Sequence, residues 1–221
     1  MRFGDPTFAY GVALAETGGH AVLRLADADI LPFNFSDFAE TVSGYVSQIK
    51  ALTQGMREET LELDRELQDN VFAEVADPAK VYRAPKAQDP VPYLNFAPLE
   101  NAVNTLRASA EDYRKAGRDV KDSGRTLTGG QSLRLNEIIF RTERALTAPE
   151  GLKGRPWFIH EIYAPGLYTG YGVMTLPSVR EAIEQRQWDE ADRQMIVVAK
   201  TLEAYSLEIR QAAAILRSAL K

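Results

Sequence analysis

The last third of the chain carries its most regular hydrophobic pattern. Apolar side chains recur there at intervals of three and four residues, at Met195, Val198, Leu202, Tyr205, Ile209, Ala212 and Leu216. This spacing gathers them on one face of a helix. Asp189 is a favourable N-cap residue and acidic side chains follow it, so the pattern predicts a helix from residue 189 to about 220. Its apolar face predicts either a bundle core or a coiled coil. The core is the simpler interpretation, although so long a helix can also offer a second face to a partner.

Three more segments repeat their apolar side chains with helical spacing. They cover residues 37 to about 70, 99 to about 123, and 132–146. Their apolar positions are Phe38, Val42, Tyr45, Val46, Ile49, Leu52, Leu99, Val103, Leu106, Ala110, Tyr113, Val120, Leu135, Ile138, Ile139, Thr142 and Leu146. No stretch shows a convincing alternation with the period of two that a half-buried strand requires. The chain is therefore predicted to be an all-α, up-and-down helical bundle, a single domain over residues 1–221.

The first 35 residues are predicted to lead into this bundle through two short helices, at residues 6–18 and 21–26. The inward face of the first is expected to hold Phe8, Val12 and Ala15. Gly18 and Gly19 are expected to separate the two helices, because glycine is favoured just after a helix ends.

Two segments interrupt the helical pattern. Residues 74–98 hold five of the eleven prolines, which predicts an extended passage over the surface, with short edge-strand character at most. Residues 147–178 are rich in glycine and proline, yet they hold five of the twenty aromatic residues. Loops of that length are usually disordered or functional, and such an aromatic one is not typical of disorder. We therefore predict a long ordered loop.

The composition is that of a soluble globular protein. Of 221 residues, 45% are hydrophobic and 26% are charged, and the net charge is −5. This balance allows a sizeable core and offers no electrostatic footprint for nucleic acid or anionic lipid. No run of 18 uninterrupted apolar residues is present, and the first residues lack the apolar stretch of a signal peptide. We expect no nucleic-acid partner and no direct membrane insertion.

The residue types offer little chemistry for catalysis. The chain has no cysteine, which excludes thiolate metal sites and thiol nucleophiles, and it has only two histidines, His20 and His160. These lie in different segments without metal-ligand spacing, so a histidine packed under a loop or bonded to backbone is the simpler interpretation. No GxSxG motif occurs, and the residues before Ser132 are typical of a helix cap. We predict no catalytic residue, no metal ligand and no cofactor in this chain.

Four short motifs stand out at the linker and the long loop. They are DPTFAY (5–10), LADADILPF (25–33), PxGLxxRP (149–156) and HEIYAP (160–165). In this order they resemble the C-terminal part of the glutamate carboxypeptidase II and transferrin receptor family, over nearly the whole chain. The region of residues 70–98 resembles the bacterial members rather than the animal carboxypeptidases.

The resemblance implies a helical, transferrin-receptor-like dimerisation domain. In that family the domain follows an α/β di-zinc peptidase domain, which holds the metal ligands and the catalytic glutamate. We therefore expect this chain to begin just after the last zinc-binding histidine of a longer protein, a zinc-dependent carboxypeptidase or aminopeptidase, and to have no activity alone. Zinc is expected in the peptidase domain. The expected partners are that domain and a second copy of the chain, paired through the long helices about a two-fold axis.

The loop after the fourth motif is implied to line the pocket for the C-terminal residue of a peptide substrate. In the carboxypeptidase, a Lys-Tyr pair there binds the carboxylates of a terminal glutamate, and the aligned residues here are Gly170 and Tyr171. Tyr171 is thus the one implied substrate-binding residue, as a hydrogen-bond donor, unless it closes the loop against the bundle. Gly170 removes a cation and so weakens the expected preference for acidic C-terminal residues. Trp157, Tyr163 and Pro165 are expected to anchor the loop.

Two functions are compatible with these features. The first is a non-catalytic dimerisation and substrate-pocket domain of a di-zinc glutamate carboxypeptidase-like hydrolase. The alternative is a protein-interaction module of a transferrin-receptor-like relative that has lost catalysis, and loss of the zinc ligands in the peptidase domain would favour it. Because the relatives are mostly exported or membrane-anchored, the resemblance implies an extracytoplasmic location for the longer protein.

Overall fold

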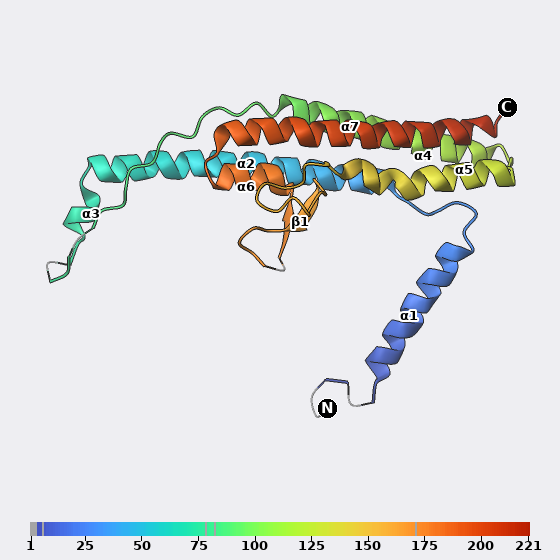
Figure 1. Cartoon of the computed structure of the whole chain (residues 1–221), viewed down its shortest axis with the longest axis horizontal. Coiled ribbons are helices and arrows are strands. Elements are labelled where there is room, and N and C mark those ends of the chain that lie inside the picture. The colour runs from blue at the N-terminus through green and yellow to red at the C-terminus, as the bar shows by residue number, and fades with distance from the viewer. Residues whose placement is uncertain (1–3, 6, 78, 82, 171) are drawn as a thin grey trace.

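Helix α4 lies beside α7 and α2, and α5 lies beside α7; the four helices alternate in direction along the chain, and α2 and α5 follow one another along the length of the bundle (Figure 1). The structure is a computed structural model that describes residues 4–5, 7–77, 79–81, 83–170 and 172–221. In chain order the elements are α1 (Ala9–Ala26), α2 (Phe35–Gln68), α3 (Val71–Glu74), α4 (Ala97–Asp122), α5 (Gly129–Arg141), the 3-10 helix η1 (Thr142–Leu146), β1 (Tyr163–Pro165), β2 (Val173–Thr175), α6 (Pro177–Glu184) and α7 (Trp188–Ser218). Among these residues the only sheet is the antiparallel pair β1–β2. The predicted all-α class is confirmed.

Helix α7 lies at the centre of the core. It packs against α4, α5, η1 and α6, whereas α2 packs against α4. All seven apolar side chains predicted along α7 are buried, so the interpretation of that face as bundle core is confirmed. The ring of Phe35 meets Tyr113 and Tyr205 edge-on, with ring centroids 5.0 and 6.0 Å apart. These favourable aromatic contacts tie α2, α4 and α7 together.

The helix starts differ from the predicted ones because of capping side chains. Helix α2 begins at Phe35, since Asn34 Oδ1 accepts hydrogen bonds from the backbone N–H groups of Ser36 and Asp37. Helix α5 begins at Gly129, because Thr128 and Gln131 form a capping box that satisfies the free N–H groups at the helix start. Residues 142–146, predicted as the end of this helix, tighten into η1.

The first helix overturns the prediction of two short helices with an inward face. Helix α1 is continuous from Ala9 to Ala26, none of its residues is buried, and Phe8 and Val12 are exposed. Gly18 and Gly19 do not end it, because a glycine ends a helix only where it takes the left-handed conformation, and these two do not. Figure 1 shows α1 projecting away from the bundle. Within the described ranges, no helix is long and apolar enough to cross a membrane.

The proline-rich passage is held on the bundle by two arginines. Arg57 donates to the carbonyl oxygen of Pro92 at 2.9 Å, and Arg186 donates to that of Asp89 at 2.9 Å. Arg186 also donates to Thr60 Oγ1 on α2, at 2.7 Å. The described part of residues 75–96 contains neither helix nor strand. Three of its carbonyl oxygens, those of Asp89, Val91 and Pro92, accept hydrogen bonds from arginine side chains.

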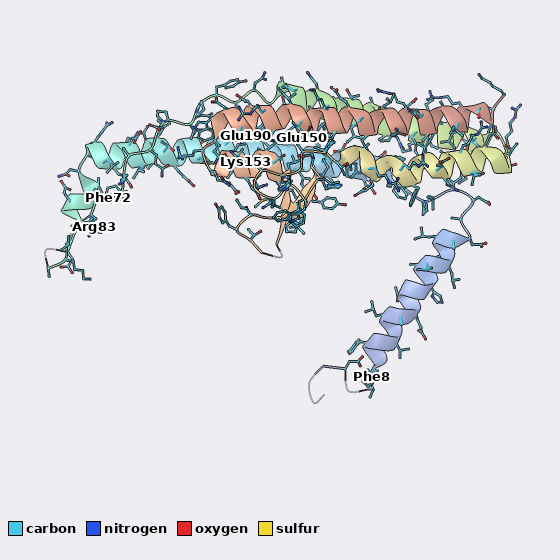
Figure 2. All side chains as sticks on the ribbon, viewed as in Figure 1. Phe8, Phe72, Arg83, Glu150, Lys153 and Glu190 are labelled. Atoms are coloured by element: carbon cyan, nitrogen blue, oxygen red, sulfur yellow. The ribbon has the colours of Figure 1, made fainter. Side chains whose placement is uncertain are left out.

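Replacing Arg186 with alanine should loosen this passage. The variant loses two hydrogen bonds from a charged group, worth together about 1–2 kcal/mol at a partly exposed site. We expect residues 75–96 to be cleaved by thermolysin about 5 to 30 times faster. Arg83→Ala is the matched control, because Arg83 is exposed at the far end of the same passage (Figure 2). Equal cleavage rates in the two variants would contradict the anchoring role of Arg186.

Candidate functional site

The predicted long loop forms an ordered lobe beneath α6 (Figure 1). Its two arms are joined by an isolated bridge between Thr147 and His160, and β1 pairs with β2 further along, with Ala164 opposite Met174. The order of the loop is as predicted. The hairpin and α6 were not predicted, because strands of three residues between glycines and prolines are too short to show a period.

A buried ion pair joins the lobe to α6. Arg155 Nη2 donates to Glu181 Oε1 at 2.7 Å, and both side chains are nearly inaccessible to solvent. The same oxygen accepts the backbone N–H of Leu167 at 2.9 Å. One carboxylate therefore holds two separate turns of the loop, and Leu167 lies next to its tip.

Arg155 has unused hydrogen-bonding capacity. Its Nε and Nη1 atoms are buried without a partner among the described residues. A buried ion pair is in any case weak evidence of stability, because taking both charges out of water costs free energy. Sequence reasoning assigned no role to Arg155 or Glu181. Arg155 lies within the PxGLxxRP motif. No feature of the sequence indicated Glu181, because it lies 26 residues further along and charged residues are usually exposed.

A second buried carboxylate lies at the base of the lobe. Ser178 Oγ donates to Glu161 Oε2 at 2.7 Å, and Glu161 is almost fully buried. Burial raises the pKa of Glu161, and the hydrogen bond from Ser178 opposes that shift only in part. A group with a raised folded-state pKa binds a proton more tightly in the folded chain, so its ionisation destabilises the fold as pH rises above the unfolded value.

The substitution Glu161→Gln should therefore raise the free energy of unfolding, relative to the wild-type chain, by an amount that grows as pH rises. Below the ordinary carboxyl pKa, Glu161 is protonated in both states and the substitution should change the unfolding free energy little. As pH rises through the folded-state pKa, the wild-type chain must bury a charge, whereas glutamine still accepts the bond from Ser178. Urea unfolding at a series of pH values from 4 to 8 measures this difference. Glu59→Gln, on the exposed side of α2, is the control and should show no such trend.

His160 belongs to a hydrogen-bonded cluster on the surface of the lobe. Its Nδ1 accepts the backbone N–H groups of Ile162 and Tyr163, so Nε2 carries the proton and donates to Glu143 Oε1 at 3.1 Å. Burial lowers the pKa of His160 and outweighs the opposing effect of Glu143. The Tyr163 hydroxyl donates to the same oxygen at 2.6 Å, and this bond raises the pKa of Tyr163 to about 12. The cluster therefore orders the start of β1 with a neutral imidazole.

The tip of the lobe is a tight glycine turn. Gly166 leaves no room for a side chain, because a Cβ there would lie 2.2 Å from Thr169 Oγ1, and Gly170 adopts a left-handed φ of 60°. Thr169 Oγ1 in turn donates to the carbonyl oxygen of Gly172. Tyr171, the implied substrate-binding residue, lies outside the described residues. The turn places its two neighbours at the exposed end of the hairpin.

The side chains expected to anchor the loop are not buried. Trp157 is 71% exposed and Pro165 is exposed, whereas Tyr163 is 45% exposed and is held by the hydrogen bond from its hydroxyl to Glu143. The buried side chains of the loop are Ala148, Leu152, Arg155, Glu161, Ile162, Ala164, Leu176, Pro177 and Ser178. Alternation along the strand explains the difference, because Ala164 turns inward and its two neighbours must then turn outward.

The surface of the lobe carries exposed aromatic side chains, among them Trp157 and Tyr168. No group of three or more metal-ligating side chains converges anywhere in the described ranges, and His20 lies exposed on α1, far along the chain from His160. A cavity of about 140 Å³ between the lobe and the start of α7 is lined by Lys153, Leu167, Glu181 and Gln194. That volume is well below the range of small-molecule sites. The exposed aromatic side chains suit contact with another macromolecular surface or a peptide.

Comparison with known proteins points to one family. Residues 94–210 match the family of transferrin receptor-like dimerisation domains. The chain is 28% identical to a protein named "Probable glutamate carboxypeptidase" from Arabidopsis thaliana, over 95% of this chain and 26% of that protein. It is 28% identical to a fungal protein of the same name from Arthroderma benhamiae, over 82% of the chain and 20% of that protein. It is also 24% identical to the aminopeptidase NAALADL1 of Mus musculus, over 91% and 23%. The chain thus spans about a quarter or less of the length of these relatives.

Proposed function

Because the chain belongs to the family of transferrin receptor-like dimerisation domains, we propose that it is the non-catalytic self-association and substrate-pocket domain of a di-zinc, glutamate carboxypeptidase-like hydrolase. The observation that supports this most is the arrangement of α1 and the lobe. Both project from the same side of the bundle (Figure 1). A catalytic domain placed on that side would be in contact with both.

The side chains of these two elements support such a contact. No residue of helix α1 is buried. Its exposed apolar side chains are Tyr10, Val12, Leu14, Val22, Leu23 and Leu25. The lobe exposes Trp157, Tyr168 and Val173. Large apolar surface that is left open in one domain is typical of an interaction site. Zinc and the reacting groups belong, in this proposal, to the catalytic domain.

The tip of the lobe would contribute to the pocket for the substrate. In this proposal Tyr171 donates a hydrogen bond to a carboxylate of the peptide, and Glu181 and Arg155 position the tip through the backbone of Leu167. Gly170 supplies no cation beside it, so we expect a weaker preference for an acidic C-terminal residue than a lysine would give.

The proposal predicts an inactive but self-associating chain. Dipeptides with a C-terminal glutamate and peptides with a free N-terminus should show no hydrolysis with this chain, with or without added zinc. Hydrolysis that a chelator abolishes and zinc restores would overturn the non-catalytic role. Light scattering over a range of concentrations should report a dimer. A strict monomer at high concentration would contradict self-association.

A further inference from the structure

The turn at residues 160–163 is built on one nitrogen of a histidine. His160 Nδ1 accepts the backbone N–H of Ile162 at 3.2 Å and that of Tyr163 at 3.3 Å, two and three positions further along the chain. The His160 side chain is only 18% exposed, so these bonds are largely shielded from water. An imidazole nitrogen accepts a hydrogen bond only while it carries no proton. The geometry of residues 160–163, called the His160 turn below, therefore depends on the protonation state of one atom.

The chain makes the same kind of turn elsewhere with a side chain that does not titrate. Asn34 Oδ1 accepts the backbone N–H groups of Ser36 and Asp37, again two and three positions further along, at the start of α2. Asparagine is common in such turns because its short side-chain oxygen reaches these groups. An amide oxygen keeps its lone pairs at any ordinary pH, whereas a histidine, with an ordinary pKa of about 6.5, gains a proton in mild acid.

We propose that the His160 turn is a pH-sensitive switch, which holds the start of the β1–β2 hairpin at neutral pH and releases it in mild acid. A proton on Nδ1 converts that atom from an acceptor into a donor. The N–H groups of Ile162 and Tyr163 then lose their acceptor and face a third N–H. The two bonds are lost together, because both depend on the same lone pair.

Burial sets the direction of the effect with pH. It lowers the pKa of His160 and outweighs the opposing effect of Glu143. The folded chain therefore binds this proton less tightly than the unfolded chain does. The stability that the neutral ring contributes is present above about pH 6.5 and is lost as pH falls through the folded-state pKa.

The groups around His160 keep the ring in place while the backbone is released. Glu143, on η1, accepts a hydrogen bond from Nε2 at 3.1 Å and attracts the ring more strongly once it is charged. The pKa of Tyr163 is raised to about 12 and burial raises the pKa of Tyr205 on α7, so both phenols stay neutral across this pH range. Arg144, also on η1, lies over an aromatic ring of α5. The imidazolium therefore stays beside η1.

The inner side of the lobe responds to acid in the opposite sense. Glu161 lies next to His160 in sequence, but its side chain is buried and bonded to Ser178 on α6. Burial raises the pKa of Glu161, and the nearby charge of Glu150 adds to that shift. Protonation of Glu161 in acid therefore favours the folded lobe. Acid should open the His160 turn locally and leave the base of the lobe folded.

Opening of this turn would affect the tip of the lobe. Strand β1 begins within the His160 turn, and the hairpin that it forms with β2 leads to the tip. The bridge between Thr147 and His160 joins the same turn to the other arm of the loop. The longer protein should therefore bind its substrate more weakly in mild acid. That consequence rests on the proposed function, whereas the switch itself belongs to this chain alone.

Amide exchange measured by NMR tests the switch in the wild-type chain. Between about pH 7.5 and pH 5, the amides of Ile162 and Tyr163 should each lose about fivefold in protection, relative to an unstructured peptide at the same pH. The loss should follow the titration of the His160 ring, with a midpoint below about pH 6.5. The amides of Ser36 and Asp37, which Asn34 holds in the same kind of turn, are the internal control and should keep their protection.

Two variants identify the group responsible. His160→Asn replaces the acceptor nitrogen by an amide oxygen, so the amides of Ile162 and Tyr163 should stay protected at both pH values. Glu161→Gln removes the neighbouring carboxylate and should retain the wild-type loss of protection. A loss that persists in His160→Asn, or that Glu161→Gln abolishes, would assign the effect to another group and overturn the proposal.

The wild-type measurement is decisive even if a variant does not fold. Protection of Ile162 and Tyr163 that is unchanged while the His160 ring gains its proton would overturn the switch. This result would leave the proposed function untouched, because self-association and the lack of hydrolysis are measured separately at neutral pH. Conversely, a chain that stays monomeric and still shows the loss of protection would contradict self-association and support the switch.

Discussion

Replacing Arg155 with alanine is expected to lower the free energy of unfolding by about 3–5 kcal/mol. The variant leaves the Glu181 carboxylate buried without its cation, held only by the backbone N–H of Leu167. A buried charge that has lost its partner carries its full desolvation cost. Urea unfolding followed by circular dichroism measures the loss. Lys153→Ala is the control two residues away, since Lys153 lies at the exposed edge of the lobe near Glu190 (Figure 2) and should cost well under 1 kcal/mol.

A double variant distinguishes a lost charge partner from lost packing. Arg155→Met/Glu181→Gln removes both charges, fills a similar volume and keeps an acceptor for Leu167. It also removes the two arginine nitrogens that have no partner. We expect it to recover most of the stability, because an apolar replacement of a buried ion pair is often neutral or favourable. A double variant as unstable as Arg155→Ala would show that the arginine acts through its shape and contacts, and not through its charge.

The ion pair also bears on how the lobe works. The pair joins the turn at Arg155 to the turn at Leu167 through one oxygen of Glu181. We interpret it as a positioning device for the tip. The double variant would then be stable. Its Leu167 amide should exchange faster with solvent than in the wild-type chain, because the neutral glutamine oxygen is a weaker acceptor than the carboxylate.

The bundle was predictable because the apolar residues of its core repeat at intervals of three and four along the helices. Every predicted apolar side chain in the seam from Met195 to Leu216 is buried on one face of α7, so burial and spacing carry the same information. The start of α2 was misplaced by two residues because capping depends on one side chain, and Asn34 competes with Ser36 for that role. Features that depend on many residues, such as a buried helix face, can be predicted from sequence. Features that depend on one side chain, such as a helix cap, are predicted less well.

The N-terminal helix shows where the pattern misleads. Phe8, Val12 and Ala15 have the spacing of a buried face, but the structure leaves them exposed because the bundle offers no surface to α1. Periodicity shows that a helix has an apolar face, and it does not show which surface covers that face. The uncovered apolar side chains of α1 therefore support the proposed contact with a partner outside the bundle.

The candidate site could be predicted only in outline. The length and aromatic content of residues 147–178 predicted an ordered loop, and the structure confirms it. The residues that hold it are Arg155, Glu161 and Glu181, charged side chains whose burial depends on contacts between distant segments. Local sequence carries no trace of such contacts, so aromatic side chains were expected as anchors in their place. The role of Tyr171 stays a prediction.

Truncating Leu202 should be among the most destabilising single changes in the core. The side chain is fully buried at the middle of the α7 seam, between α4 and the helices on the other side. Leu202→Ala removes buried methyl and methylene groups and leaves a cavity, for which about 2–5 kcal/mol is expected. Alanine is a strong helix former, so the helix itself is not weakened and the loss reports packing. Denaturant unfolding should show a lower midpoint with an unchanged slope.

Leu207→Ala is the matched control on the same helix. It makes the same chemical change five residues away, on the exposed side of α7, where half of the side chain is already accessible to solvent. It should cost less than about 1 kcal/mol. Equal losses for the two variants in dilute solution would contradict the assignment of one face to the core and the other to the surface.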